Sequence, residues 1–282
     1  MRSRRSTDLV QFGVVIWQPC GFVAVIPSIL AATIPFPMWI SYSPLLTMKP
    51  YRQVPIQECG EPLVAIPVEL FAIETPHSYV KCGADYGGMS PYYLRQGVLD
   101  RLIQAQTGLQ KLHPSWQIQI FDAYRPVEVQ QYMVDYTFRQ TCDRRNLDLA
   151  KLSDLEIEHI WKDVYQIWAV PSFELETPPP HSTGAAIDIT LVNEDGIPID
   201  MGSPIDEMSD RSTPGYFDKS HDPLDQQYQQ QRQLLARIMT DVGFLRHPDE
   251  WWHFSIGDQL WAWLNHQTDP QHPIPAYYGR VI

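Results

Sequence analysis

The sequence carries little positive charge. Its 282 residues include 21 Lys and Arg against 33 Asp and Glu, which gives a formal net charge of −12 at pH 7. Proteins that bind nucleic acid neutralise its phosphates with a basic face. This composition offers no such face, so we expect no nucleic-acid partner. With 44% hydrophobic and 19% charged residues, the chain has the composition of a folded globular protein rather than a disordered one.

Cysteine is also scarce. The four cysteines lie far apart and include no CxxC pair; they are Cys20, Cys59, Cys82 and Cys142. Zinc sites made of thiolates need paired cysteines at short spacing, so this spacing argues against a thiolate metal site. It neither requires nor excludes an oxidising compartment.

Charge is absent altogether from residues 9–48, a run of 40 residues without Asp, Glu, Lys or Arg. An arginine-rich start before an apolar run is typical of an exported leader or a membrane anchor, although five prolines interrupt the run and disfavour a spanning helix. A start near Met48 is the slightly favoured alternative and predicts a cytoplasmic protein. A leader or anchor would place the body outside the cytoplasm, with membrane contact only if residues 1–47 form an anchor. We therefore divide the chain into an N-terminal extension, 1–48, and one catalytic-sized domain, 49–282.

Hydrophobic periodicity places helices and strands in mixed order along the domain. Alternating apolar residues predict strands, and recurrence at i, i+3 and i+4 predicts helices. We expect strands over 116–122, 185–193 and 252–256, and helices over 93–111, 127–140, 154–168 and 224–242. Because no regular βαβ alternation is present, this order favours the α+β class.

The most informative motif is PPPHSTGAAIDITL at residues 178–191. It places His181 and Asp188 seven residues apart, a step that spans roughly 23 Å when extended. Zinc ligands lie ~2.0–2.2 Å from the metal. The two side chains can therefore share an ion only if the chain folds back, which Gly184 permits. Taken alone, this spacing favours a structural histidine and aspartate.

A second motif, DEWWHFSI at residues 249–256, sets Glu250 three residues before His253. A carboxylate beside a metal-bound water takes its proton and passes it to a leaving amine. Regular strand alternation would send the two side chains to opposite faces, so the pair requires a turn or bulge between them. Taken alone, the motif describes a histidine buried among core tryptophans.

The third motif is IFDAYRP at residues 120–126, which places Arg125 at the end of a predicted strand. A guanidinium in such a position stabilises an oxyanion or clamps a substrate carboxylate. The alternative, which the motif alone favours, is a surface ion pair between Arg125 and Asp122 or another acid.

Together, two histidines, an aspartate, a glutamate and an arginine make an open three-ligand metal site with a base and an electrophile. The sequence resembles the zinc D-alanyl-D-alanine dipeptidases of the vancomycin-resistance type, in the larger family with D,D-carboxypeptidases and the hedgehog signalling fold. The resemblance covers about residues 60–260. The pattern H-x-x-G-x-A-x-D at 181–188 is shared across the wider family, whereas DAYRP, MGSPIDEMS and EWWHFS are similar to the dipeptidase branch.

The resemblance implies one Zn²⁺ per subunit, held by His181, Asp188 and His253. It implies Glu250 as the general base and acid, and Arg125 as the stabiliser of the transition state. It also implies a single mixed domain with a central, mostly antiparallel sheet flanked by helices. The implied reaction is hydrolysis of the D-alanyl-D-alanine dipeptide, a small D,D-dipeptide, to two D-alanines by metal-activated water.

Substrate contacts follow less directly. Asp206 in MGSPIDEMS matches an acidic residue of the family motif, and we expect it to receive the substrate ammonium or to orient a metal ligand. Ser182 and Tyr124 are further candidates. Prolines at 178–180 replace the serines common in family dipeptidases, and the loop at 76–91 also departs from the family pattern. The remaining histidines are expected in surface or hydrogen-bonded roles.

Two other functions remain open. One is a D,D- or L,D-carboxypeptidase that trims peptidoglycan stem peptides with the same metal chemistry and a wider cleft. The other is a non-catalytic, zinc-stabilised binding module on this fold. A base and an electrophile at the site count against the second, since a structural metal site needs neither.

Overall fold

The computed structural model describes residues 49–282; the alternatives for a leader, an anchor or a later start fall on residues 1–48, outside this part. The helices are α1 (Ser78–Lys81), α2 (Gln96–Leu112), α3 (Val127–Arg144), α4 (Asp154–Ile167), α5 (Pro223–Thr240) and α6 (Gln259–Thr268). The strands are β1 (Leu63–Ala65), β2 (Ala72–Ile73), β3 (Tyr93–Arg95), β4 (Gln117–Asp122), β5 (Ala186–Val192), β6 (Leu245–Arg246) and β7 (His253–Ser255). Short 3₁₀ segments are η2 (Pro50–Gln53), η3 (Leu149–Lys151), η4 (Pro180–Thr183) and η5 (Asp210–Ser212).

Five of these strands form the central sheet, in the order β2-β4-β5-β7-β6. Only the β2–β4 pair is parallel, and the other three pairs are antiparallel. Strands β1 and β3 form a separate two-stranded ribbon. The expected α+β class, with a mostly antiparallel sheet and flanking helices, is confirmed.

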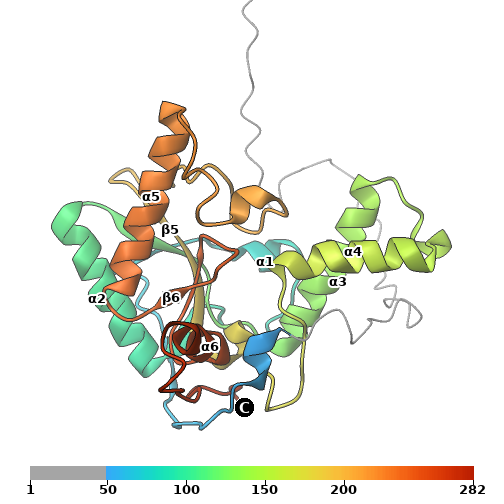
Figure 1. Cartoon of the computed structure of the whole chain (residues 1–282), viewed down its shortest axis with the longest axis horizontal. Helices are drawn as coiled ribbons and strands as arrows, with labels where there is room; N and C mark the ends of the chain where they lie inside the picture. The colour runs from blue at the N-terminus through green and yellow to red at the C-terminus, as the bar shows by residue number, and fades with distance from the viewer. Residues whose placement is uncertain (1–48) are drawn as a thin grey trace, which may run out of the picture.

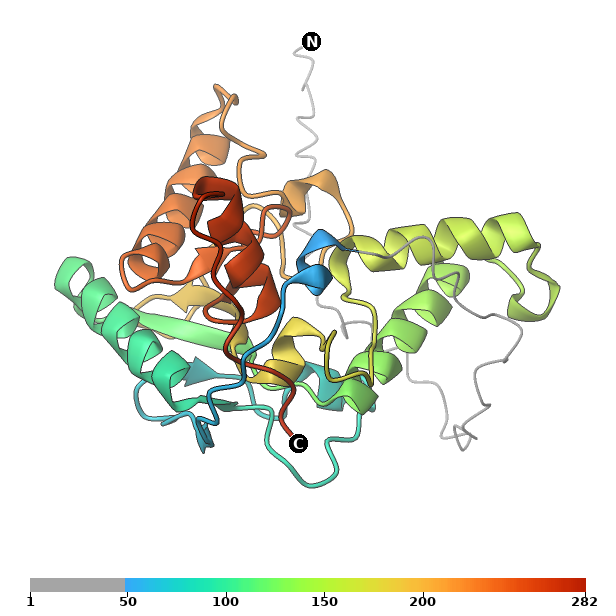
Figure 2. The same cartoon turned by 60° about the horizontal axis from the view of Figure 1, so that its bottom comes forward.

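Two apolar clusters divide the domain. In the first, α2 and α5 pack together over the sheet; in the second, α3 and α4 pack together around Phe138 and Trp161. Figures 1 and 2 show the two helix pairs on opposite sides of the molecule. The partly buried ring of Phe121, in β4, packs against both clusters. The end of β4 therefore lies where the two clusters meet, and the site described below lies next to it.

Several element boundaries follow from local chemistry. Helix α4 begins at a capping box, in which the Ser153 hydroxyl and the Glu156 carboxylate each accept from the other residue's backbone N–H, an arrangement that satisfies two free donors. The expected helix start at residue 93 is wrong, because Tyr93–Arg95 pairs with β1 and the helix begins at Gln96. The segment forms a short strand rather than a helical turn because the Arg95 side chain is buried and its guanidinium donates to three backbone carbonyls.

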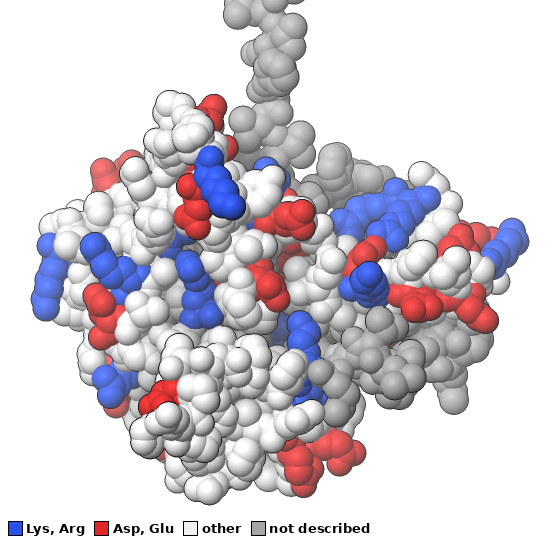
Figure 3. Space-filling model, in the orientation of Figure 1, with Lys and Arg blue, Asp and Glu red and all other residues white. Residues whose placement is uncertain are grey.

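Surface charge is mixed. On the face shown in Figure 3, blue Lys and Arg side chains stand interspersed with red Asp and Glu side chains. Among residues 49–282, no helix is both long enough and apolar enough to cross a lipid bilayer.

Candidate metal centre and active-site pocket

Strand pairing brings the chemistry-bearing residues together. Asp122 in β4 lies opposite Asp188 in β5, and Asp188 lies opposite His253 in β7. His181 reaches the same place from the one-turn segment η4, which ends at Gly184 with φ +70°. A positive φ is easy for glycine, so Gly184 makes the fold-back that the seven-residue spacing requires. A side chain there would also meet Leu63, because an added Cβ would lie 2.6 Å from its Cδ1.

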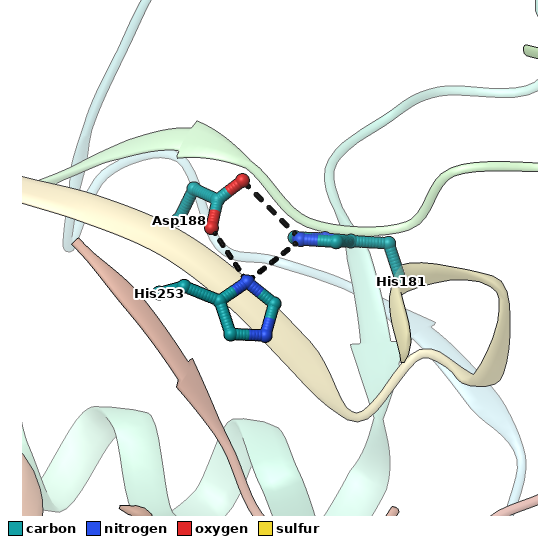
Figure 4. A group of neighbouring side chains, drawn as sticks. All are labelled: His181, Asp188 and His253. Carbon is teal, nitrogen blue, oxygen red and sulfur yellow. Dashed lines mark hydrogen bonds and ion pairs between the residues drawn. The ribbon is translucent and has the colours of Figure 1, made fainter. Parts of the chain in front are cut away.

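Three ligand atoms of His181, Asp188 and His253 converge (Figure 4). His181 Nε2 lies 3.2 Å from Asp188 Oδ2 and 3.2 Å from His253 Nδ1, and His253 Nδ1 lies 2.9 Å from Asp188 Oδ1. All three side chains are buried. A metal held by tetrahedral ligands ~2.0–2.1 Å away keeps those ligands roughly 3.3 Å apart. The spacing therefore fits a small tetrahedral cation, and two imidazoles with one carboxylate suit zinc.

The second nitrogen of His181 is held by its surroundings. Nδ1 lies 2.7 Å from the carbonyl oxygen of Ala123, so it donates there, and it is 3.3 Å from Asp122 Oδ2. A proton fixed on Nδ1 leaves Nε2 as the lone-pair donor toward the centre. Burial opposes ionisation of Asp188, but the two adjacent histidines outweigh it and hold the pKa of that carboxyl well below its usual range. Asp188 is therefore ionised, which is the form of a carboxylate that binds a metal.

Glu250 approaches the same centre from a turn before β7. Its carboxylate oxygens lie 3.9 Å from His253 Nδ1 and 3.8 Å from His247 Nδ1. The turn between Glu250 and His253 is the one that the motif requires. Burial raises the pKa of Glu250 well above its usual range, and the charges of Asp188 and Asp206 raise it further. A carboxyl with a raised pKa is suited to accept and return a proton near neutral pH.

Arg125 is buried beside this group. Its Nε and Nη2 donate to Asp122 Oδ2 at 2.9 and 2.6 Å, and its Nη1 donates to Gln130 Oε1 at 2.6 Å. The guanidinium lies 4.9 Å from the ring centres of Tyr79 and Trp168 and is 4% exposed. The ion pair with Asp122 exists, but the expected surface location is wrong. Arg125 is a rigidly held interior cation.

Asp206 is the other acid at the site. It has φ +63°, a left-handed conformation that aspartate tolerates better than most residues, and the Tyr79 hydroxyl donates to its Oδ2 at 3.0 Å. Burial, together with the negative charges of Asp188 and Asp122, raises the pKa of Asp206 to about 7. A cationic group placed beside this carboxyl would favour its ionised form.

A pocket of roughly 460 Å³, part of it open to solvent, joins these groups. It is lined by Lys49, Tyr51, Arg125, Ile167, Trp168, Ala169, Pro180, His181, Asp188, Asp206, His247, Glu250 and His253. The groups described above therefore face one common space.

Two of the expected substrate contacts do not reach the pocket. The Ser182 hydroxyl donates to the backbone carbonyl of Arg125 at 2.8 Å, and Tyr124 is buried without lining the pocket. Strand and turn geometry sends adjacent side chains in different directions, so residues next to a metal ligand or to Arg125 in the sequence need not face the pocket. Ser182 instead supports the backbone of Arg125.

The structure also adds residues that the motifs missed. His247, expected in a surface or hydrogen-bonded role, accepts a hydrogen bond from the Asp249 N–H at 3.2 Å and also lines the pocket, because the β6–β7 hairpin places it beside His253. Lys49 and Tyr51 reach the pocket from the far N-terminal end of the domain, and no sequence signal marked them. His77 has one of the hydrogen-bonded roles expected for the remaining histidines: its Nδ1 accepts from the Tyr79 N–H at 3.1 Å, and its Nε2 lies 3.2 Å from Asp122 Oδ1 in the interior.

Comparison with known proteins places the chain among peptidases. It is 54% identical over 240 residues to a D-alanyl-D-alanine dipeptidase of Synechocystis sp., covering 83% of this chain and 97% of that protein. It is 43% identical over 76 residues to a D-alanyl-D-alanine dipeptidase of Escherichia coli, covering 27% of this chain and 37% of that protein. A solved structure of the LD-carboxypeptidase LdcB aligns with a TM-score of 0.40 and 15% identity, over 76% of this chain and 75% of that one. The family model for D-Ala-D-Ala dipeptidases matches residues 73–274, and the chain belongs to this peptidase family.

Proposed function

We propose that the protein is a zinc-dependent dipeptidase that hydrolyses D-Ala-D-Ala to two molecules of D-alanine. The observation that carries the proposal is the convergence of His181, Asp188 and His253 on one point, with Glu250 beside it. The 54% identity to a named D-alanyl-D-alanine dipeptidase across nearly its whole length supports the same substrate.

In this proposal His181, Asp188 and His253 would hold one Zn²⁺, a set of three protein ligands as in catalytic zinc sites. When bound, such an ion supplies Lewis-acid polarisation of a carbonyl and lowers the pKa of water. A donor set of two imidazoles and one carboxylate without thiolate is the chemical reason for choosing zinc over harder cations.

Glu250 is the general base and acid. Its carboxylate lies 3.9 Å from the His253 nitrogen that would bind the metal, so it stands beside the place where a reacting water would be held. It takes a proton from the attacking water and returns it to the amine of the departing D-alanine. Its raised pKa favours the second half of that exchange, because a carboxyl that holds its proton more tightly is a competent acid at neutral pH.

Arg125 stabilises the negative charge that develops on the scissile carbonyl oxygen. Its contacts with Asp122 and Gln130 fix the guanidinium before substrate arrives, and a preorganised cation in a water-poor site acts strongly on a developing charge. Asp206, next to Tyr79, receives the free ammonium of the substrate. These roles give Glu250, Arg125 and Asp206 each a task in one reaction.

The test is release of free D-alanine by the purified full-length chain loaded with zinc. Three substrates are compared: D-Ala-D-Ala, its mirror image L-Ala-L-Ala, and a pentapeptide stem ending in D-Ala-D-Ala. We expect turnover of D-Ala-D-Ala alone. Preferential release from the stem would contradict the proposal and move the function to a carboxypeptidase. Zinc binding without turnover of any of the three would favour the non-catalytic module.

A further inference from the structure

A dipeptide zwitterion brings an ammonium and a carboxylate into the pocket, and each needs a partner of opposite charge there. Three carboxylates line it, and Asp206 is the one without a place in the metal group or the proton transfer. Permanent cations on the lining are Arg125 and Lys49. Arg125 is already committed to Asp122 and Gln130. The free carboxylate of a substrate therefore needs another partner.

Lys49 is the other cation of the lining, and it is half-buried. Among residues 49–282, no side chain forms a hydrogen bond or an ion pair within 4.0 Å with its ammonium. Burying part of a charged group without a partner is costly, so a cation left in this state at a pocket wall marks a place where an anion binds.

The backbone that carries Lys49 is firmly attached. The Arg52 N–H donates to the Lys49 carbonyl at 3.1 Å, and Tyr51, the next pocket residue, is 6% exposed. The Gln259 side chain, at the start of α6, donates to the carbonyl of Val54 at 2.6 Å. Figures 1 and 2 show η2, in blue, beside α6, in dark red. Lys49 is therefore presented by a fixed segment.

Lys49, Glu250 and His247 line the same pocket. The positive charge of Lys49 acts on both neighbours, because it lowers the pKa of Glu250 and that of His247. Burial drives the pKa of His247 well below its usual range, and the charge of His253 lowers it further, so His247 is neutral and does not compete for an anion. Asp206 is bonded instead to Tyr79, whose hydroxyl accepts from Arg125 at 3.2 Å.

The reaction also determines on which side of the scissile bond each charge of the substrate lies. Glu250 returns its proton to the nitrogen of the departing residue, and the free carboxylate of a dipeptide is attached to the carbon next to that nitrogen. The carboxylate therefore lies on the Glu250 side of the scissile bond, and the ammonium lies on the other. The two ends of the pocket match the two ends of the zwitterion.

We propose that the Lys49 ammonium binds the free carboxylate of the substrate's C-terminal residue and makes the enzyme selective for peptides that end one residue beyond the scissile bond. This inference rests on the proposed function. It assigns specificity to a residue outside the three sequence motifs and outside residues 73–274, which the family match covers.

The experiment compares two substrates that differ only at that carboxylate, D-Ala-D-Ala and D-Ala-D-alaninamide. The full-length wild type is compared with Lys49→Met, which keeps the length of the stem, and with Lys49→Arg, which keeps the charge. A hydrogen bond to a charged group corresponds to about 10- to 100-fold in binding. We expect Lys49→Met to raise KM for the acid by that factor, with little change for the amide. The ratio of kcat/KM between acid and amide should then collapse, whereas Lys49→Arg should keep most of it.

Two controls separate binding from indirect effects. Lys111→Met removes an exposed lysine from the end of α2 and should leave the ratio unchanged. Removing the Lys49 charge also raises the pKa of Glu250, so kcat is measured against pH for both substrates. An effect through Glu250 alone would lower turnover of acid and amide in parallel.

An unchanged acid-to-amide ratio in Lys49→Met, or a parallel loss on both substrates, would overturn the inference and leave the proposed function standing. A wild type that does not distinguish acid from amide would overturn it as well. Absence of turnover of D-Ala-D-Ala by the wild type would instead refute the proposed function, and this inference with it.

Discussion

Asp122 and Arg125 form an interior ion pair in which two guanidinium nitrogens donate to one carboxylate oxygen, Oδ2. The other oxygen, Oδ1, lies 3.2 Å from His77 Nε2. Oδ2 is also 3.3 Å from His181 Nδ1. A single carboxylate thus supports both the cation and one of the histidines of the pocket. Asp122 is fully buried, and the nearby positive charges hold its pKa below the usual range although burial opposes them.

The first prediction concerns this pair. Asp122→Asn keeps the size of the side chain and removes its charge, which leaves the Arg125 guanidinium buried without its main counterion. Breaking a buried pair from one side costs about 3–5 kcal/mol. We expect a loss of that order in the free energy of unfolding measured with urea. We also expect a fall in kcat, because Arg125 and His181 lose a shared support.

The matched control is Asp148→Asn. Asp148 forms an ion pair with Lys151 at 2.9 Å, but both side chains are more than half exposed. Water and salt screen such a pair, so we expect no measurable change in unfolding or in turnover. Equal effects of the two substitutions would show that burial does not matter at Asp122.

The sequence predicted the core of the fold well where periodicity was strong. Strands β4, β5 and β7 and helices α3, α4 and α5 lie within a few residues of the expected ranges. The short elements β2, β6 and α1 were missed, because two to four residues hold too little periodicity to reveal a strand or helix. Helix α6 (Gln259–Thr268) was missed as well, since no helix was expected beyond residue 242.

The sequence motifs predicted the central residues of the site but not the residues that surround and support them. His181, Asp188, His253, Glu250 and Arg125 all line the pocket, because their spacing reflects one sheet edge and its adjoining turns. The supporting residues come from distant segments, and nothing local marks them. Such partners depend on how the strands are ordered, which the motifs do not specify.

The second prediction concerns Glu250. Glu250→Gln keeps the shape of the side chain and removes its ability to carry a proton. General acid–base catalysis contributes typically 10²–10⁴-fold, so kcat should fall by that factor while one zinc per chain is retained. Metal content by mass spectrometry and D-alanine release measure the two quantities separately. Asp249→Asn, at the exposed neighbouring position, should leave both unchanged.

The third prediction separates His253 from His247, two buried histidines whose ring centres lie 5.6 Å apart. His253→Ala should abolish stoichiometric zinc binding, because it removes one of three ligands. His247→Ala should retain it, because His247 is not part of the converging group. The measurement is the zinc content of each variant after dialysis against a weak chelator. Loss of zinc from both variants to the same extent would contradict the ligand assignment.

The fourth prediction is a pH dependence from Asp206. Its pKa of about 7 in the folded protein is above the ordinary value of ~3.9 for the unfolded chain. A group whose pKa is raised by folding stabilises the protein at low pH and loses that contribution as the pH rises through the folded pKa. In the metal-free protein, wild type should therefore lose roughly 2–3 kcal/mol relative to Asp206→Asn between pH 5 and pH 8.

Urea unfolding of both proteins across this pH range measures the difference in their free energies of unfolding. The contributions of groups that titrate alike in the two proteins cancel in this difference. A difference that stays constant with pH would show that Asp206 does not titrate there. Added zinc provides a further check, because a divalent cation near Asp188 favours the ionised form of a neighbouring acid. The pH dependence of the difference should accordingly shrink when the metal is bound. That result would place Asp206 in the electrostatic field of the metal while leaving its carboxylate free for an ammonium group.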